Sequence, residues 1–148
     1  MAFSFPKNVT FPDAEKIICT YLKDQFSEVT PKVHVGTWIP DSSGEILDSG
    51  EAILFANRVG GYADYNDRAS VDNSIVCLSI VGKTRRDALD VAMYARQCLY
   101  DISSGGFIGD WRISRIQENE GPSELAYSDP TTRLVRLYFQ VGIVRHTR

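Results

Sequence analysis

The sequence predicts an α+β fold in which two helices pack on one face of a mostly antiparallel sheet, in the order helix, three strands, helix, two strands. Three observations predict it. Two segments repeat apolar residues every three or four positions, and five others alternate apolar with polar residues or are rich in β-branched side chains. The 148 residues contain no linker or internal repeat, so residues 1–148 are expected to form a single domain.

The first helix is predicted from Pro12 to Phe26. Pro12 and Asp13 suit a first helical turn, because a missing N–H group is tolerated there and a negative charge meets the positive end of the helix dipole. Apolar residues then follow at helical spacing and form one face: Ala14, Ile17, Ile18, Tyr21, Leu22 and Phe26.

Three strands are predicted between the two helices. Residues 32–38 alternate through Val33 and Val35, residues 51–59 form the second strand, and residues 73–81 are rich in β-branched side chains. Residues 40–50 (PDSSGEILDSG) consist largely of turn formers, and we expect a surface loop there.

The second helix is predicted to begin at Thr84, which forms a capping-box-like pair with Asp87, and to stop at Gly105 and Gly106. A fourth strand is predicted over residues 112–117, a polar loop over 118–132, and a long final strand after it. The buried stripe of the helix is predicted to be Ala88, Val91, Ala92, Ala95, Leu99 and Ile102. The inward face of the last strand is predicted to be Val135, Leu137, Phe139, Val141 and Ile143.

Composition excludes several classes of protein. Hydrophobic residues make up 43% of the chain and charged residues 24%, which is typical of a globular domain and not of a disordered one. Sixteen Lys and Arg stand against nineteen Asp and Glu, so no polybasic attraction to nucleic acid or membrane is expected. No apolar run approaches the roughly 20 residues of a membrane span. No signal peptide is expected, and the three widely spaced cysteines are expected to be reduced thiols of an intracellular product.

The charge is distributed unevenly along the chain. Residues 1–74 carry 6 basic and 11 acidic side chains, whereas residues 75–148 carry 10 basic and 8 acidic ones. Oppositely biased surfaces favour head-to-tail self-association, although the imbalance of −5 and +2 is small.

Two glycine motifs indicate connecting turns. Gly82-Lys83-Thr84 follows a strand and opens a helix, as a phosphate-binding loop does, but the position that needs the first glycine of such a loop is Cys77, inside a predicted strand. The stretch Gly106-Phe107-Ile108-Gly109 has the spacing of an RNA-binding GxxG clamp. It separates a helix from a strand, however, and an aspartate follows it.

No group of residues predicts catalysis. Cysteines and histidines are the only nitrogen and sulfur ligand candidates, and no two of them stand at metal-ligand spacing. Acidic residues gather in two predicted loops, where solvation opposes the tuning that acid–base catalysis needs. The residues therefore give no catalytic signature, and no metal or cofactor is expected. The ligand candidates are Cys19, Cys77, Cys98, His34 and His146, and the acidic residues are Asp64, Asp67, Asp72, Glu118, Glu120 and Glu124.

The connection between the second and third predicted strands, residues 58–72, is the most unusual segment. It is long compared with hairpin loops of about 2–5 residues, and doubled back it can project about 20–25 Å. Tyr and Arg are favoured at the centres of protein interfaces. We expect an oligomer interface here, with a flexible loop or simple extension of the strands as the alternatives. The expected interface residues are Arg58, Tyr62, Asp64, Tyr65, Asp67 and Arg68.

Three stretches occur together in one order: the turn Arg58-Val59-Gly60-Gly61 with its polar loop, the strand, turn and Ala-rich helix of residues 75–102, and the Gly-Pro loop with an alternating final strand at residues 121–145. In this combination the chain resembles the tail terminator (tail completion) proteins of siphovirus-type long-tailed bacteriophages. With the first helix, the resemblance covers most of the chain, although residues 40–50 match nothing diagnostic.

The resemblance implies a non-enzymatic, structural virion protein. Such proteins assemble, usually six together, into a ring that caps the finished tail tube, ends tube polymerisation and offers a surface to which the head docks. The implied partners are further copies of the chain, the tail tube protein and a head-completion or neck protein. DNA would pass through the lumen without specific binding, and no membrane is implied. The implied location is the head-proximal end of the virion tail, after assembly in the host cytoplasm.

Two other classes of function fit the sequence. Another neck or head–tail connector component, or a tail tube subunit, could share the α+β topology, although the sheet of a tube subunit should continue edge to edge with its neighbours. A small-molecule-binding or enzymatic domain should instead show a concave pocket lined by perturbed titratable groups.

Overall fold

The computed structural model describes residues 2–63, 70–125 and 133–146 of the chain. Its secondary structure confirms the predicted α+β class and the predicted order of the long elements. In chain order the elements are α1 (Ala14–Gln25), β1 (Val33–Gly36), α2 (Ser43–Asp48), β2 (Ala52–Ala63), β3 (Val71–Gly82), α3 (Arg85–Asp101), β4 (Gly106–Ile108), β5 (Trp111–Leu125) and β6 (Arg133–Val144).

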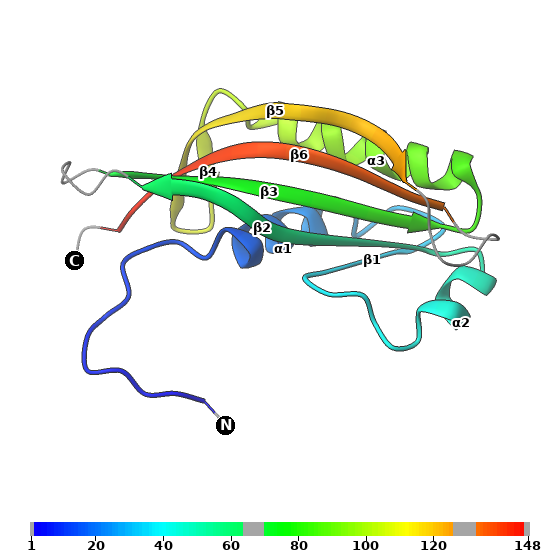
Figure 1. Ribbon diagram of the computed structural model, residues 1–148, viewed down its shortest axis with the longest axis horizontal. Helices are drawn as coiled ribbons and strands as arrows, with labels where there is room; N and C mark the ends of the chain where they lie inside the picture. The colour runs from blue at the N-terminus through cyan, green and yellow to red at the C-terminus, as the bar shows by residue number, and fades with distance from the viewer. Residues whose placement is uncertain (1, 64–69, 126–132, 147–148) are drawn as a thin grey trace.

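The strands form one six-stranded sheet in the order β1-β2-β3-β6-β5-β4. Only β1 and β2 pair in parallel, and every other neighbouring pair is antiparallel. The sheet curls, with α1 and α3 behind it in the view of Figure 1. The last strand of the sequence, β6, lies inside the sheet, between β3 and β5. Residues of β6 and of the first helix, α1, therefore pack in the same core.

Helix α1 begins where the sequence predicts. Asp13 is its N-cap, and the carboxylate accepts a hydrogen bond of 3.2 Å from the backbone N–H of Lys16. Ile17, Ile18 and Leu22 of the predicted stripe are at most 6% exposed. The stripe therefore buries against the sheet, as its spacing requires.

Helix α3 lies on the same face of the sheet. The Thr84 hydroxyl caps it by accepting a 3.1 Å hydrogen bond from the backbone N–H of Asp87. Ala88, Ala92 and Ala95 are fully buried. A Cβ at Gly82 would stand 2.8 Å from the backbone nitrogen of Ala88, so this glycine allows the helix to start close against the end of β3. The strand-to-helix turn is thus the structural role of Gly82-Lys83-Thr84.

The prediction of a loop over residues 40–50 is wrong, because the short helix α2 lies there. It has no side-chain cap, and Leu47 holds it in place by packing with Ile53, Val81 and Leu134. These three residues alternate with the residues that face α1 and α3, so α2 covers part of the opposite face of the sheet. Tertiary burial, which local sequence does not display, stabilises this helix.

Two predicted loops are partly strand. β2 continues to Ala63 and β3 starts at Val71, so the long connection consists largely of paired strands. β5 likewise continues to Leu125 through the predicted polar loop. Both extensions contain register shifts, one between Arg58 and Gly60 and others along β5. Such bulges break the two-residue alternation by which a strand is predicted.

The short strand β4 was also not predicted. Residues 106–108 pair with the first residues of β5, and Gly109, at φ 58°, lies in the turn between the two strands. The GxxG stretch is therefore strand β4 and the first residue of a hairpin turn, so the expectation of a plain connecting turn holds only for Gly109.

Candidate functional site

The outer half of the β2–β3 hairpin, from Arg58 to Asp72, holds a compact polar network. The Arg58 guanidinium donates to the Ser74 hydroxyl at 3.0 Å and to the Asp72 carboxylate at 3.3 Å, and Ser74 donates to the other carboxylate oxygen at 3.2 Å. Asp72 is 5% exposed, so its charge needs these partners. The expectation of a solvated carboxylate at this position is wrong, because β3 carries Asp72 into the edge of the core.

The same network ties the hairpin to α1. The backbone N–H of Arg58 donates to the Glu15 carboxylate at 2.8 Å. This bond forms beside the register shift of β2, where regular pairing with β3 is interrupted. The start of the hairpin extension is therefore held by side chains from both α1 and β3.

Two of the predicted interface residues lie in the described part of the chain, and they differ in role. Arg58 is engaged in the polar network, whereas Tyr62 is 66% exposed further along β2. Val59 adds a second exposed apolar side chain at 56%. The remaining predicted interface residues, Asp64, Tyr65, Asp67 and Arg68, lie outside the described residues. The interface assignment stays a prediction.

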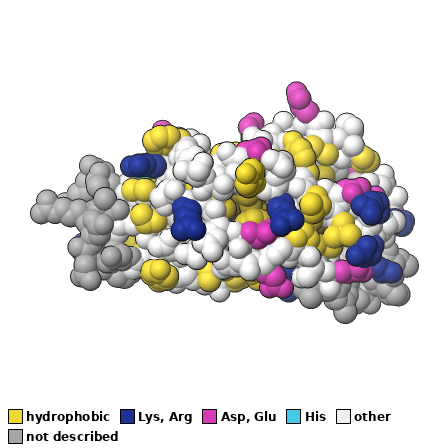
Figure 2. All heavy atoms as spheres, turned by 90° about the horizontal axis from the view of Figure 1, so that it is seen from above, with side chains coloured by type: hydrophobic (Ala, Val, Ile, Leu, Met, Phe, Trp, Pro, Cys, Tyr) yellow, Lys and Arg dark blue, Asp and Glu magenta, His cyan; other side chains and the backbone are white. Residues whose placement is uncertain are grey.

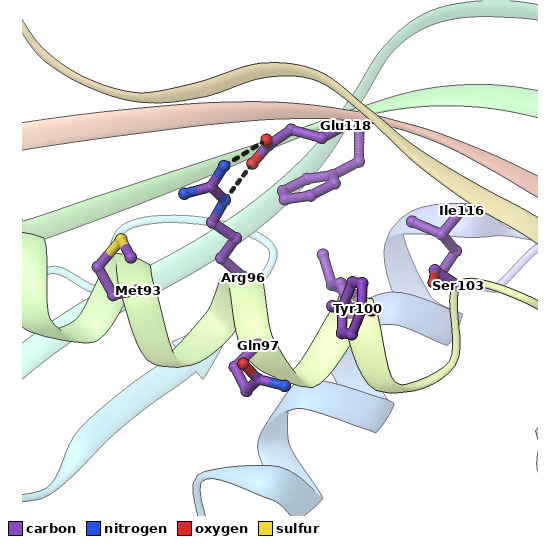
Figure 3. A pocket seen from close by; sticks show the side chains of 9 residues that line it. Met93, Arg96, Gln97, Tyr100, Ser103, Ile116 and Glu118 are labelled. Atoms are coloured by element: carbon purple, nitrogen blue, oxygen red, sulfur yellow. Dashed lines mark hydrogen bonds and ion pairs between the residues drawn. The ribbon is translucent and has the colours of Figure 1, made fainter.

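A pocket of about 520 Å³ lies between α3 and β5, at the other edge of the sheet (Figure 3). Its apolar lining comes from both elements and from β6, and Met93 and Tyr100 stand at its helical wall with exposed fractions of 50% and 72%. The lining residues are Met93, Arg96, Gln97, Leu99, Tyr100, Ser103, Ile116, Glu118 and Phe139.

The charged groups in this pocket neutralise each other. Arg96 Nη2 donates a hydrogen bond of 2.8 Å to Glu118 Oε2, and Arg96 Nε lies 2.7 Å from Glu118 Oε1 as a second close charge contact. The pair joins α3 to β5 across the pocket. The pocket therefore presents apolar surface with little net charge, which suits apolar side chains better than an ionic ligand.

Figure 2 looks at the molecule from above, along the edge formed by β5 and α3. Hydrophobic side chains gather around a hollow in the middle of this face, with basic and acidic side chains interspersed at its rim. An apolar hollow with a polar rim is the usual anatomy of a protein–protein contact.

The sequence analysis did not find this pocket. It assigned one stripe of α3 to the core and left the neighbouring positions as surface. Met93, Gln97 and Tyr100 recur at spacings of four and three, which places them on a second face of the same helix. The sequence feature that could have indicated this pocket is the presence of a methionine and a tyrosine on an outward face of the helix.

The other predicted chemistry-bearing side chains have structural environments. Burial raises the pKa of the Cys19 and Cys98 thiols, which keeps them protonated and weakly nucleophilic. The His34 imidazole lies 2.8 Å from the Glu51 carboxylate, and His146 stacks on Trp111 with ring centroids 3.5 Å apart. Neither contact pairs a histidine with a thiol.

Two of the three acidic residues of the second predicted loop form ion pairs, whereas Glu120 is exposed as expected. Glu118 bonds Arg96 as described, and Glu124 lies 2.8 Å from Arg85 and 3.2 Å from Arg133. Across residues 2–63, 70–125 and 133–146, no group of three or more His, Cys, Asp or Glu side chains is placed to hold a metal ion. In the same residues, no helix is long and apolar enough to cross a membrane.

An α+β domain with a curled sheet and exposed apolar surface at both edges is suited to assembly with other subunits. A similar fold occurs in a chain of the virion of a native gene transfer agent particle, with a TM-score of 0.58, 9% sequence identity, and coverage of 88% of this chain and 96% of that one. At this identity the likeness concerns the fold. No curated protein matches the sequence significantly.

The family model of phage tail termination proteins matches residues 10–148. The chain therefore belongs to the phage tail termination protein family, and it is a structural protein of the virion tail. This confirms the resemblance seen in the sequence. Residues 2–9 precede the matched region.

Proposed function

We propose that this chain is the subunit of a ring that caps the phage tail tube. The resemblance to tail terminators implies six copies in the ring. The ring ends tube polymerisation and provides the surface on which the head docks. The observation that carries this proposal is the match to the tail termination family over residues 10–148. The tube protein and a head-completion or neck protein are its proposed partners, at the head-proximal end of the tail.

Two different surfaces on one subunit support a closed ring. Head-to-tail contacts require two unlike, complementary patches, because each copy uses one patch on its predecessor and the other on its successor. The β2–β3 hairpin with exposed Tyr62 lies at one end of the strands, and the pocket with exposed Met93 and Tyr100 lies between α3 and β5. A subunit with unlike patches at separate places can close into a ring.

The outer edge of β5 favours a terminator over a tube subunit. Register shifts occur between Ile113 and Arg115, between Glu118 and Glu120, and between Glu120 and Ser123. Pro122 lies in the last shifted segment and has no N–H group to donate. Bulges and proline on an edge strand oppose regular pairing with another strand. A sheet with this edge is poorly suited to continue into the sheet of a neighbour.

The mildly acidic composition suits a passage for DNA. The net formal charge is −3, so the subunit has no overall attraction for the phosphate backbone. We propose that DNA crosses the lumen without specific binding, since a channel that bound DNA tightly would hinder its exit. Assembly would take place in the host cytoplasm before incorporation into the virion.

The test combines the purified chain with tail tube protein that is polymerising from a fixed seed. We expect six-fold rings by electron microscopy at one tube end, and tube growth that stops when the chain is added. Tubes incubated with buffer alone continue to grow and supply the control.

Two outcomes would contradict the proposal. In one, the chain stays monomeric on the tubes and their growth is unaltered. In the other, the chain copolymerises along the tube wall, which would identify it as a tube subunit instead.

A further inference from the structure

The first residues of the chain form an aromatic arm, residues 2–9, that has no helix or strand and extends from the body (Figure 1). Phe3 is 86% exposed, Phe5 68% and Val9 73%. The rings of Phe3 and Phe5 stack, with centroids 6.1 Å apart and an interplanar angle of 24°. Large apolar side chains gathered on one exposed segment mark a contact surface.

The arm starts from a fixed base. The backbone N–H of His146 donates to the Thr10 carbonyl at 3.1 Å, and the Arg145 guanidinium lies over the Phe11 ring at 5.2 Å from its centroid. Pro12 is buried beside them. The point from which the arm departs is therefore set by the end of β6, while the aromatic side chains beyond it face solvent.

We propose that the aromatic arm of one subunit docks in the pocket between α3 and β5 of the next copy in the ring, with Phe3 and Phe5 inserted over Leu99 and Phe139. This deepens the proposed function and rests on it. The occupant is a second copy of this chain.

The positions of arm and pocket support this arrangement. The base of the arm lies where β6 ends and β5 begins, because Thr10 bonds His146 and His146 stacks on Trp111. From there the arm hangs below the sheet in Figure 1, on the side of β2, whereas α3 and β5 lie along the upper side. An arm that points away from its own pocket can reach the pocket of a neighbouring copy. The two surfaces are unlike, as a head-to-tail contact requires.

The dimensions also agree. Phe3 and Val9 are six residues apart and reach about 20 Å when extended. The pocket wall on α3 runs from Met93 to Ser103, ten residues or about 15 Å of helix. The arm is thus long enough to follow the whole pocket. In an extended segment Phe3 and Phe5 project to the same side, so both rings can enter together.

The chemistry of the two surfaces is complementary. The pocket of about 520 Å³ is mainly apolar, and the Arg96–Glu118 pair leaves it without a charge that would exclude phenyl rings. Lys7 is the only charged residue of residues 2–9. Beside the pocket, the exposed Asp101 accepts a hydrogen bond of 2.8 Å from Gln97, which offers a carboxylate to an arriving lysine.

The experiment places the photo-crosslinking residue p-benzoylphenylalanine at position 5 of the full chain. Copies labelled with ¹⁵N and unlabelled copies are mixed before ring assembly, illuminated and digested, and crosslinked peptides are identified by mass spectrometry. We expect crosslinks to residues 93–103 that join labelled with unlabelled copies. Crosslinks confined to one copy, crosslinks to another surface, or none in assembled rings would overturn the docking.

A pair of variants completes the test. Phe3→Ser with Phe5→Ser should weaken subunit association about tenfold or more, since loss of buried aromatic anchors at an interface costs at least that much. Phe3→Tyr with Phe5→Tyr keeps the rings and should associate nearly as the wild type does. Equal association of the serine and tyrosine variants would overturn the proposal.

The outcomes separate the arm from the terminator function. Rings that cap tubes but give no crosslink between arm and pocket refute the docking and leave the terminator proposal standing. Crosslinks between copies without any ring support the docking and refute the ring. Absence of both refutes both.

Discussion

Arg96 on α3 and Glu118 on β5 meet in an ion pair with two close contacts, at 2.7 Å and 2.8 Å, inside a pocket that is otherwise mainly apolar. The pair crosses from helix to sheet at Glu118, the last residue of a regularly paired stretch of β5 before its next register shift. It therefore fixes the width of the pocket as well as its charge.

Removing one member of this pair should cost more than removing both. Arg96→Met leaves a carboxylate that is only 29% exposed without its cation, whereas Arg96→Met with Glu118→Leu leaves no charge. We expect a coupling free energy of about 1 kcal/mol, because the pair is partly solvated. Urea unfolding of the two single variants and the double variant measures it. Additive effects of the single variants would show that the pair contributes nothing.

The network at Arg58 should stabilise the fold. Arg58→Ala removes the cation from Asp72, whose carboxylate is nearly buried, and we expect a loss of about 2 kcal/mol in the free energy of unfolding. Arg58→Ala with Asp72→Asn should recover part of that loss, because the neutral amide needs no counter-charge. Thermal unfolding of both variants is the measurement. A double variant less stable than Arg58→Ala would contradict the assignment.

Tyr62 should act on assembly and not on folding. Its side chain is 66% exposed, so Tyr62→Ser should change the unfolding free energy by less than about 0.5 kcal/mol. If the hairpin enters the subunit interface, the same variant should shift rings towards monomers in sedimentation velocity. Unchanged rings would remove Tyr62 from the predicted interface, with Val59→Ser as the matched second test on the same strand.

Gly82→Ala should be strongly destabilising. The new methyl group would lie 2.8 Å from the backbone nitrogen of Ala88, so α3 would have to move away from the end of β3. We expect a cost of about 1–3 kcal/mol, as for other overpacked sites. Gly44→Ala in α2 is the control: nothing lies within 4 Å of its Cβ position, and alanine favours helix by up to about 1 kcal/mol. Similar melting temperatures of the two variants would refute this reading of the turn.

Alkaline pH should reveal the burial of Tyr21. Burial raises the pKa of Tyr21 to about 12, and its hydroxyl donates to the Cys98 carbonyl at 2.7 Å. From pH 10 to 12 the folded chain keeps a proton that the unfolded chain loses, so the free energy of unfolding should fall as pH rises across this window. For the Tyr21→Phe variant, the free energy of unfolding, measured by denaturant titration at each pH, should fall less steeply as the pH rises. Identical slopes would show that Tyr21 ionises equally in both states.

The long regular elements could be predicted because local rules and tertiary burial agree in them. Asp13 and Thr84 cap the two main helices, and Val135, Leu137 and Phe139 alternate into the core along β6. In β6, the side chains that follow the local pattern are also the ones buried in the core. The local pattern and the burial therefore predict the same position for these residues.

The missed elements are those in which tertiary contacts outweigh the local pattern. α2 contains Gly44 and lacks a capping hydrogen bond, and Leu47 stabilises it only through partners on three distant strands. The outer half of β5 carries Gly121 and Pro122 yet pairs with β6 through bulges. Neither contact leaves a periodic trace in the sequence.

The candidate site was predicted only in part. The hairpin that carries Arg58 and Tyr62 was singled out for its length and residue types, but the inward network of Arg58 was not foreseen, because it needs Asp72 and Ser74 from the paired strand. The pocket on α3 combines residues of two strands with a helix, and such a hollow depends on how far the helix stands from β5.

The irregular edge of β5 also has a consequence for the unassembled pool of this protein. Free copies of an assembling subunit must not associate through their open strand edges. Straight, apolar strand edges would let such copies stack into fibrils of the cross-β kind. The exposed charge of Glu120 and the missing donor of Pro122 make this edge a poor template. We therefore expect free copies to resist amyloid-like stacking along this strand.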